Sequence, residues 1–211
     1  MDVSSQEPVL DQRIARGDAT RAQIVDAARA VLAESGFAAA TTRAVALRAG
    51  VQLSLVHYHF GTKRQLLGAV LEHENARLLA RQGDLYAGPE PLAEKWRTAC
   101  RYLGEDLRSG YVRILWELWS AGLADEELAQ RWRQAMAGWR ALLERVATEW
   151  AEETGIELPM PPRALATLVA NAFQGVEVEI LAGVSEEEAP HYEALEACAA
   201  LIEAVDPSRN T

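Results

Sequence analysis

Residues that could contact nucleic acid are concentrated between positions 41 and 63. Thr41, Thr42 and Arg43 stand where a helix is expected to begin, and the free backbone N–H groups and dipole of a helix N-terminus favour a phosphate. About ten residues later a second short helix mixes polar, aromatic and aliphatic side chains, and Lys63 follows it within reach of a DNA backbone. The segment therefore has the chemistry of a DNA-binding surface.

The elements that must position these residues are two short helices joined by the tight turn Ala49-Gly50-Val51. The first is capped by Thr41 or Thr42 and is expected to bury a small apolar face. The second spans about residues 53–60, and its buried positions are Val56 and Phe60. The other side chains of this helix are expected on its open side: Leu53, Ser54, Leu55, His57, Tyr58 and His59. This is the pattern of a helix-turn-helix unit whose second helix enters the major groove.

His57 and His59 form an HxH pair, which can indicate a metal site. Side chains two residues apart on a helix point about 200° apart, so they cannot chelate one ion together. We expect both to contact DNA and predict no metal.

The net charge of −10 argues against a nucleic-acid partner only if it is evenly spread. From Gln12 to Arg64, eight basic residues stand against three acids, which gives +5. The chain after Arg64 has 13 basic and 25 acidic residues, which gives −12, and three acids precede Gln12. A small basic segment joined to a large acidic one indicates a nucleic-acid-binding module.

The rest of the sequence excludes several classes of protein. No apolar run approaches the roughly 18 residues of a membrane span, and the polar N-terminus does not resemble a signal peptide. Two isolated cysteines, Cys100 and Cys198, form no disulfide framework, so we expect a cytoplasmic protein. Nucleophile, phosphate-loop and zinc-protease motifs are not found, and we expect neither an enzyme nor a cofactor.

The periodicity predicts an all-α fold of about nine helices. A first helix over about 20–35 ends at Gly36, and helices over about 63–81, 91–108, 111–122, 126–153, 163–182 and 189–205 follow the two short ones. We expect a flexible arm over 1–16, a DNA-binding domain over 17–64, a helical domain over 65–207 and a tail over 208–211.

Ordered landmarks in residues 18–70 resemble the DNA-binding domain of TetR-type transcriptional repressors. The segments are Thr20-Arg-Ala-Gln-Ile-Val-Asp-Ala-Ala, Glu34-Ser-Gly-Phe37, Thr41-Thr42, Arg48-Ala-Gly-Val51 and Tyr58-His-Phe-Gly-Thr-Lys63. The resemblance implies a phosphate contact for Arg21, which alternatively pairs with Asp18. His57 stands where the family usually has a tyrosine that contacts a phosphate, so DNA affinity is expected to be mildly pH-sensitive.

Six tryptophans lie in the middle helices, and a stripe from Leu128 to Trp150 reads either as core or as the wall of a pocket. The resemblance implies a small-molecule effector among these helices. The pocket candidates are Trp96, Cys100, Leu103, Trp116, Trp119, Met136, Trp139, Phe173 and Glu177. Glu177 is either a buried anchor for a cationic or hydrogen-bond-donating ligand or a surface charge.

The last two helices carry broad apolar stripes that either cover the chain's own core or form a homodimer interface as a four-helix bundle. The interface candidates are Leu165, Leu168, Val169, Ala172, Val176, Ile180, Leu195, Cys198 and Ile202. The leading interpretation is a dimeric repressor that binds operator DNA and is released by an effector, with no membrane partner. The alternatives are an activator with the same DNA-binding domain and a helical interaction protein.

Overall fold

A computed structural model describes residues 7–206, with side chains from residue 15 onward. In this part of the chain all regular structure is helical, as expected for an all-α fold. The helices are α1 (Glu7–Ala39), α2 (Thr42–Ala49), α3 (Leu53–Phe60), α4 (Lys63–Ala87), α5 (Leu92–Ser109), α6 (Tyr111–Gly122), α7 (Glu126–Thr154), α8 (Pro162–Ala182) and α9 (His191–Val205). The expected tail over 208–211 lies outside the described residues.

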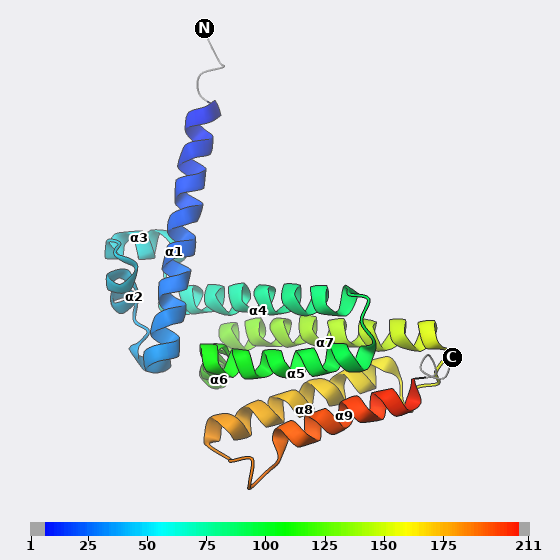
Figure 1. Ribbon diagram of the computed structural model, residues 1–211. Coiled ribbons are helices and arrows are strands. Elements are labelled where there is room, and N and C mark those ends of the chain that lie inside the picture. The colour runs from blue at the N-terminus through cyan, green and yellow to red at the C-terminus, as the bar shows by residue number, and fades with distance from the viewer. Residues whose placement is uncertain (1–6, 207–211) are drawn as a thin grey trace.

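The first three helices form a lobe at one end of the molecule (Figure 1). Thr41 caps α2 by accepting a hydrogen bond from the Ala44 N–H, and Gly50 ends α2 at a positive φ of 67°. Ile24, Val45 and Val56, from α1, α2 and α3, are fully buried against one another. These contacts hold the short helices, which are too short to be stable alone.

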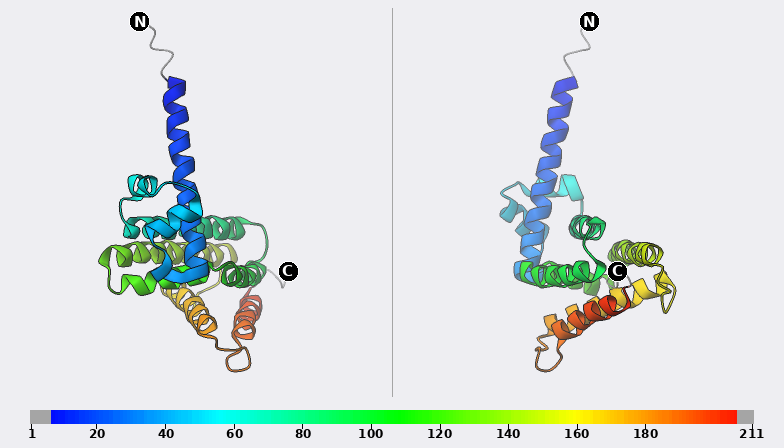
Figure 2. Two further views of the ribbon diagram at one scale, coloured as in Figure 1. Left: turned by 90° about the vertical axis from the view of Figure 1, so that its left-hand side faces the viewer. Right: turned by 45° about the vertical axis from the view of Figure 1, so that its right-hand side comes forward.

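Helices α4 to α9 form a layered body. In Figure 1, α4, α5 and α7 run alongside one another, and α8 and α9 form a further layer beneath them. Helix α8 packs on α7, and α9 packs on α5. Figure 2 shows that α8 and α9 lie at the bottom of the body, whereas α1 projects from the top.

The N-terminal lobe and the body share one hydrophobic core. Residues of α1, α2, α3, α4, α6 and α7 belong to the same buried cluster, and Leu66, Leu67 and Val70 of α4 are fully buried in it. The domain boundary that we expected after Arg64 lies within the first turn of α4. The two parts are thus joined by a rigid helix and common packing rather than by a linker.

Three expected helix ends differ from the structure. Residues from Glu7 to Arg16, expected as part of a flexible arm, continue α1. Pro8 lies in the first turn of this helix, where a missing N–H costs little. Gly36 does interrupt the helix, with φ 75° and ψ 178°, but one more turn follows to Ala39. Helix α4 extends to Ala87 instead of 81 because Gly83 is tolerated in its interior.

The outer faces of α8 and α9 remain apolar and exposed. Leu168 is 57% exposed and Leu201 is 67% exposed. Leu195, expected at a dimer interface, is instead 4% exposed and packs inside the chain against α5, so that assignment is wrong. Val169, Val176, Cys198 and Ile202 also pack partly against this inner cluster. The apolar residues of α8 and α9 therefore divide into two groups: some pack into the chain's own core, and others form an exposed face.

Helix α8 alters one further expectation. By length and composition alone, Pro162–Ala182 is long and apolar enough to cross a bilayer, although the sequence analysis expected no such segment. This is weak evidence, because helices of soluble proteins pass the same test. The helix also carries Glu177 and Glu179 and packs on α7.

Candidate nucleic-acid interface and effector cavity

Helices α2 and α3 form the expected helix-turn-helix unit. The turn between them is closed by the Val51 N–H, which donates to the Ala46 carbonyl at 3.0 Å. The Gln23 side-chain amide of α1 donates to the Ala49 carbonyl at 2.7 Å, which ties the end of α2 to α1. The unit is therefore held in place from both sides, and α3 presents a fixed outer face.

The outer face of α3 is exposed as the periodicity predicts. Tyr58 is 82% exposed, and Leu53 and Leu55 are each 39% exposed. Ser54 and His57 are also exposed, whereas His59 is half-buried and its ring packs edge-on against Tyr58, with centroids 5.1 Å apart. An exposed aromatic and two aliphatic side chains on a short, rigid helix suit apolar contacts with base edges.

His57 uses one ring nitrogen within the protein. Its Nδ1 lies 3.0 Å from the carbonyl oxygen of Gly61. A carbonyl only accepts, so Nδ1 carries the proton, and the Nε2 of the neutral ring has none to donate. Hence His57 donates to a phosphate through Nε2 only when the ring is protonated.

The basic side chains of the first lobe differ in whether they form ion pairs within the protein. Arg48 is paired with Glu34 through two contacts of 2.9 and 2.6 Å, and Arg64 is paired with Asp125 at the start of α7. Arg43, by contrast, is exposed and makes no ion pair within the described part of the chain. Arg43 thus stands free beside the N-terminus of α2, as a phosphate contact requires.

Arg21 and Lys63 lie close to aromatic rings of the same lobe. The Arg21 guanidinium lies 5.2 Å from the centroid of the Phe60 ring, and no ion pair with Asp18 forms in the described structure. The Lys63 ammonium donates to the Phe37 carbonyl at 2.7 Å and sits 4.3 Å from the Phe37 ring centroid, and burial lowers its pKa. Lys63 therefore holds α4 to the end of α1 here rather than extending toward solvent as expected.

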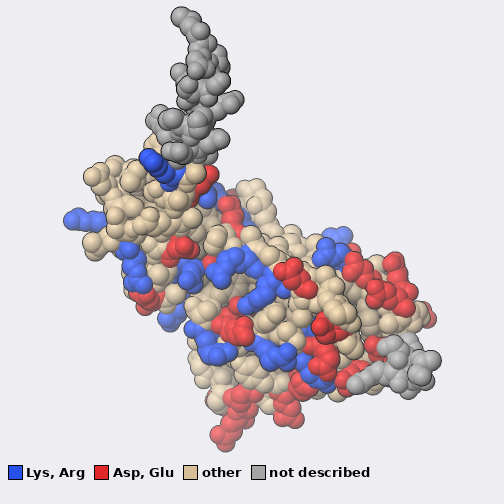
Figure 3. All heavy atoms as spheres, turned by 45° about the horizontal axis from the view of Figure 1, so that its top comes forward, with Lys and Arg blue, Asp and Glu red and all other residues tan. Residues whose placement is uncertain are grey.

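The charge asymmetry is visible on the surface. In Figure 3 the largest groups of acidic side chains lie on the helical body and its far end, away from the N-terminal lobe. A polyanion that approaches this protein is thus repelled by the body and accepted at the lobe.

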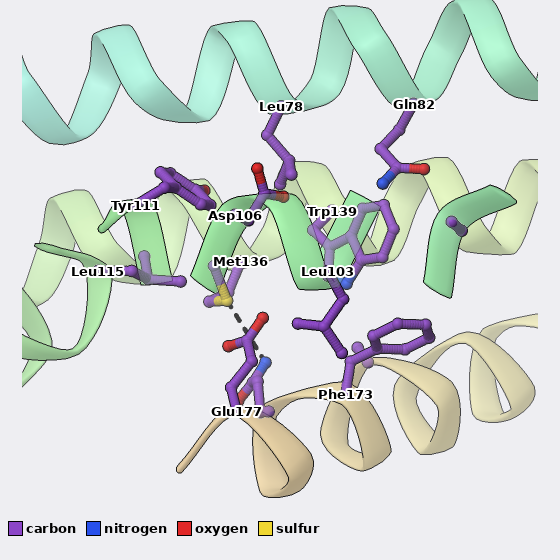
Figure 4. Close-up of a pocket in the computed structure, with 13 residues that line it drawn as sticks. Leu78, Gln82, Leu103, Asp106, Tyr111, Leu115, Met136, Trp139, Phe173 and Glu177 are labelled. Carbon is purple, nitrogen blue, oxygen red and sulfur yellow. Dashed lines mark hydrogen bonds between the residues drawn. The ribbon is translucent and has the colours of Figure 1, made fainter. Parts of the chain in front are cut away.

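A cavity of about 50 Å³ lies within the body, between α4, α5, α6, α7 and α8 (Figure 4). Its walls are mostly apolar, with several polar side chains among them. The lining residues are Leu78, Gln82, Ala99, Leu103, Asp106, Tyr111, Leu115, Met136, Trp139, Ala170, Phe173, Gln174 and Glu177.

Part of the expected pocket lines this cavity and part does not. The predicted residues at the wall are Leu103, Met136, Trp139, Phe173 and Glu177. Trp96, Cys100, Trp116 and Trp119, also expected at a pocket, do not line this cavity. Trp96 packs against Phe173, with ring centroids 5.4 Å apart, and Trp116 packs against Trp119 at 5.2 Å. These large rings fill the space between helices instead of bordering a void.

Apart from Glu177, the polar residues of the cavity wall were not predicted from the sequence. Gln82, Asp106 and Tyr111 come from α4, α5 and the first residue of α6, which no apolar stripe marks. Burial is the main cause that raises the pKa of both Asp106 and Tyr111. The same effect raises the pKa of Glu177 to about 7, although Trp116 donates its indole N–H to this carboxylate at 3.1 Å.

Comparison with known proteins agrees with this architecture. The sequence model described as "Bacterial regulatory proteins, tetR family" matches residues 24–70, which run from α1 into α4. The HTH-type transcriptional repressor Rv3405c of Mycobacterium tuberculosis is 49% identical over 57 residues, which is 27% of this chain and 30% of that protein. The matched part thus spans less than a third of that relative's length.

Two solved structures share the fold over most of the chain. A TetR-family transcriptional regulator from Pectobacterium atrosepticum has a TM-score of 0.67 and 24% identity, covering 89% of this chain and 94% of that one. The transcriptional regulator FadR from Bacillus subtilis, solved with stearoyl-CoA, has a TM-score of 0.68 and 18% identity, covering 85% of this chain and 96% of its own. The helix-turn-helix segment of this chain is thus similar to that of the bacterial regulatory proteins of the tetR family, and the helical body has the same fold as these two solved structures.

Proposed function

We propose that this protein is a cytoplasmic transcriptional repressor that binds operator DNA as a homodimer and is released by a small-molecule effector. The observation that carries the proposal is the outer face of α3, where Tyr58, Leu55 and Leu53 are exposed on a helix that α1 and α2 hold rigidly. Apolar side chains fixed at the surface cost solvation free energy, which contact with a partner recovers.

DNA is the partner that fits this face. An α-helix fits the width of the major groove, and the exposed aromatic and aliphatic side chains contact base edges there. Thr42 and Arg43 lie in the first turn of α2, whose N-terminus favours a phosphate. Thr41 uses its oxygen to cap the helix but retains its hydroxyl proton as a donor.

Dimerisation is supported by the exposed apolar faces of α8 and α9. Leu168, Leu181, Leu201 and Val205 are all more than a third exposed. Two copies related by a two-fold axis bury these faces together and present two α3 helices to successive turns of DNA. The symmetry predicts an operator with two related half-sites.

The effector site that we propose is the cavity, because its walls come from five helices, among them α4 and α6, which also belong to the core shared with the DNA-binding lobe. An effector that binds better to one arrangement of these helices shifts the population of α3 positions. The relative and the two solved structures named above are regulators by name, and we propose no catalytic activity.

Salt-dependent binding to random-sequence duplex DNA tests the DNA-binding part of the proposal. Fluorescence anisotropy over about 50 to 200 mM salt gives the number of phosphate contacts from the slope of log affinity. Arg43→Gln is expected to reduce that slope by about 1, whereas the matched control Arg145→Gln on α7 leaves it unchanged. Absence of binding at the lowest salt, or equal slopes for both variants, would contradict the proposal.

A further inference from the structure

Several polar side chains line the cavity. Glu177 and Asp106 contribute carboxyl groups, Tyr111 contributes a hydroxyl, and Gln82 contributes a side-chain amide. The Gln82 carbonyl and the Tyr111 hydroxyl are buried, and neither has a hydrogen-bond partner among the described residues. The side chains are 4% and 7% exposed, respectively. A buried polar group without a partner is costly, so these atoms indicate a ligand that donates hydrogen bonds.

Within residues 15–206, no basic side chain forms an ion pair with Glu177. The indole N–H of Trp116 is its hydrogen-bond partner, and the nearby carboxyl of Asp106 repels it. The Arg81 guanidinium pairs with Asp106 and lies 4.4 Å from the Tyr102 ring centroid. A carboxylate held among apolar walls without a counter-ion is stabilised by a cation that enters the site.

The cavity also has an apolar end. In Figure 4, Glu177 and Tyr111 lie toward one side, whereas Trp139 and Phe173 lie toward the other. Aromatic faces attract cations and pack against hydrocarbon, so this end accommodates the tail of an organic ligand. The volume of about 50 Å³ is far below that of sites for drug-sized molecules, which indicates a compact ligand.

Resting on the proposed function, we propose that the effector is a small organic ammonium ion whose N–H groups donate to Glu177 and Tyr111 and whose apolar tail packs on Trp139 and Phe173. The site discriminates by charge, since an anion of equal shape meets two carboxylates and a neutral alcohol leaves Glu177 without a counter-ion.

Isosteric probes test this directly in the absence of DNA. Isothermal titration calorimetry at about pH 8 compares ethylammonium with ethanol and acetate, and n-propylammonium with 1-propanol and propionate, because these compounds are small enough for the cavity. We expect one of the two ammonium ions to bind at least about tenfold more tightly than its alcohol, and the carboxylates to bind most weakly. In Glu177→Gln the preference for ammonium over alcohol is expected to disappear.

Glu179→Gln is the matched control, because Glu179 lies on the same helix but is 54% exposed. It should keep the full preference for ammonium. The proposal is overturned if neither ammonium ion binds, if alcohol or carboxylate binds as tightly, or if both variants lose the preference equally.

The outcome is separable from the proposed function. Binding of the probes requires no DNA, and duplex binding by the unmodified protein is measured on its own. A protein that selects ammonium ions but does not bind DNA refutes the regulator and keeps this site. A protein that binds DNA but does not select ammonium ions refutes this site and keeps the regulator.

Discussion

Glu117 of α6 accepts a hydrogen bond from the backbone N–H of Phe37, with Oε2 and N 3.1 Å apart. Phe37 follows Gly36 at the kink of α1, so this bond joins the helical body to the corner from which α2 begins. A Cβ at Gly36 would lie 3.1 Å from Glu117 Oε1, and the backbone there has a positive φ. Glycine thus permits the close approach that the bond requires.

We predict that removing this bond loosens the corner between α1 and α2. Glu117→Ala should lower the free energy of unfolding by about 1–3 kcal/mol, because it removes a charged acceptor and leaves the Phe37 N–H without its partner. Chemical denaturation measures the loss, and hydrogen exchange should show reduced protection of the Phe37 amide. Glu117→Gln retains a side-chain acceptor and is expected to lose less. Unchanged protection in Glu117→Ala would refute the link.

His57 is predicted to contribute to DNA affinity through its exposed ring on α3. Its Nδ1 lies 3.0 Å from the Gly61 carbonyl oxygen, and this contact holds the ring in one orientation. His57→Ala should weaken binding roughly threefold, within the range for one hydrogen bond. Anisotropy titrations at constant ionic strength measure the loss. His59→Ala is the control, since His59 is half-buried; a His57→Ala protein that binds as tightly as the unmodified protein would contradict the assignment.

The oligomeric state is predicted to depend on the exposed faces of α8 and α9. Leu168→Glu or Leu201→Glu places a charge on an apolar face and should weaken the dimer at least about tenfold. Sedimentation velocity over a concentration series measures the change. Leu123→Glu is the control, since Leu123 is 72% exposed in a different part of the molecule. If all three variants behave like the unmodified protein, the interface lies elsewhere.

Protein stability is predicted to fall as pH rises through the range in which Glu177 ionises. Burial raises its pKa from 4.5 to about 7, so between these values the folded state binds more protons than the unfolded state. The loss is expected to reach about 2 kcal/mol by pH 8, discounted from the full shift because the side chain is partly exposed. Urea unfolding at several pH values measures it.

In Glu177→Gln most of this slope should vanish. Some should remain, because burial also raises the pKa of Asp106. Glu179→Gln is expected to show the original slope. A flat profile for the unmodified protein would show that Glu177 is well solvated.

Periodicity and capping residues predict most of this fold. Helix α3 begins and ends at Leu53 and Phe60 as expected, because Val56 and Phe60 set its buried face and Gly61 ends it. The extension of α1 before Thr20 was missed, since the sequence of that segment is largely polar and shows no sustained apolar periodicity. Hydrophobic pattern marks helices that pack, whereas a helix that projects from the lobe depends on propensity alone.

The cavity could be predicted only in part. Apolar periodicity indicates that Trp96, Trp119 and Trp139 are buried, but it does not distinguish a ring that fills space from a ring that borders a void. That difference depends on where helices distant in sequence cross. For the same reason the Lys63 contact with the Phe37 carbonyl, 26 residues away, left no local signal.

The most direct test of the central claim is selection of duplex DNA by the purified protein from a random-sequence library. We predict enrichment of one motif with two related half-sites spaced by about one or more helical turns. Tyr58→Ala and Leu55→Ala should bind that motif at least about tenfold more weakly, with little effect on binding to unselected DNA. If no motif is enriched, or if both variants bind the selected sequence as tightly as the unmodified protein, α3 is not a recognition helix.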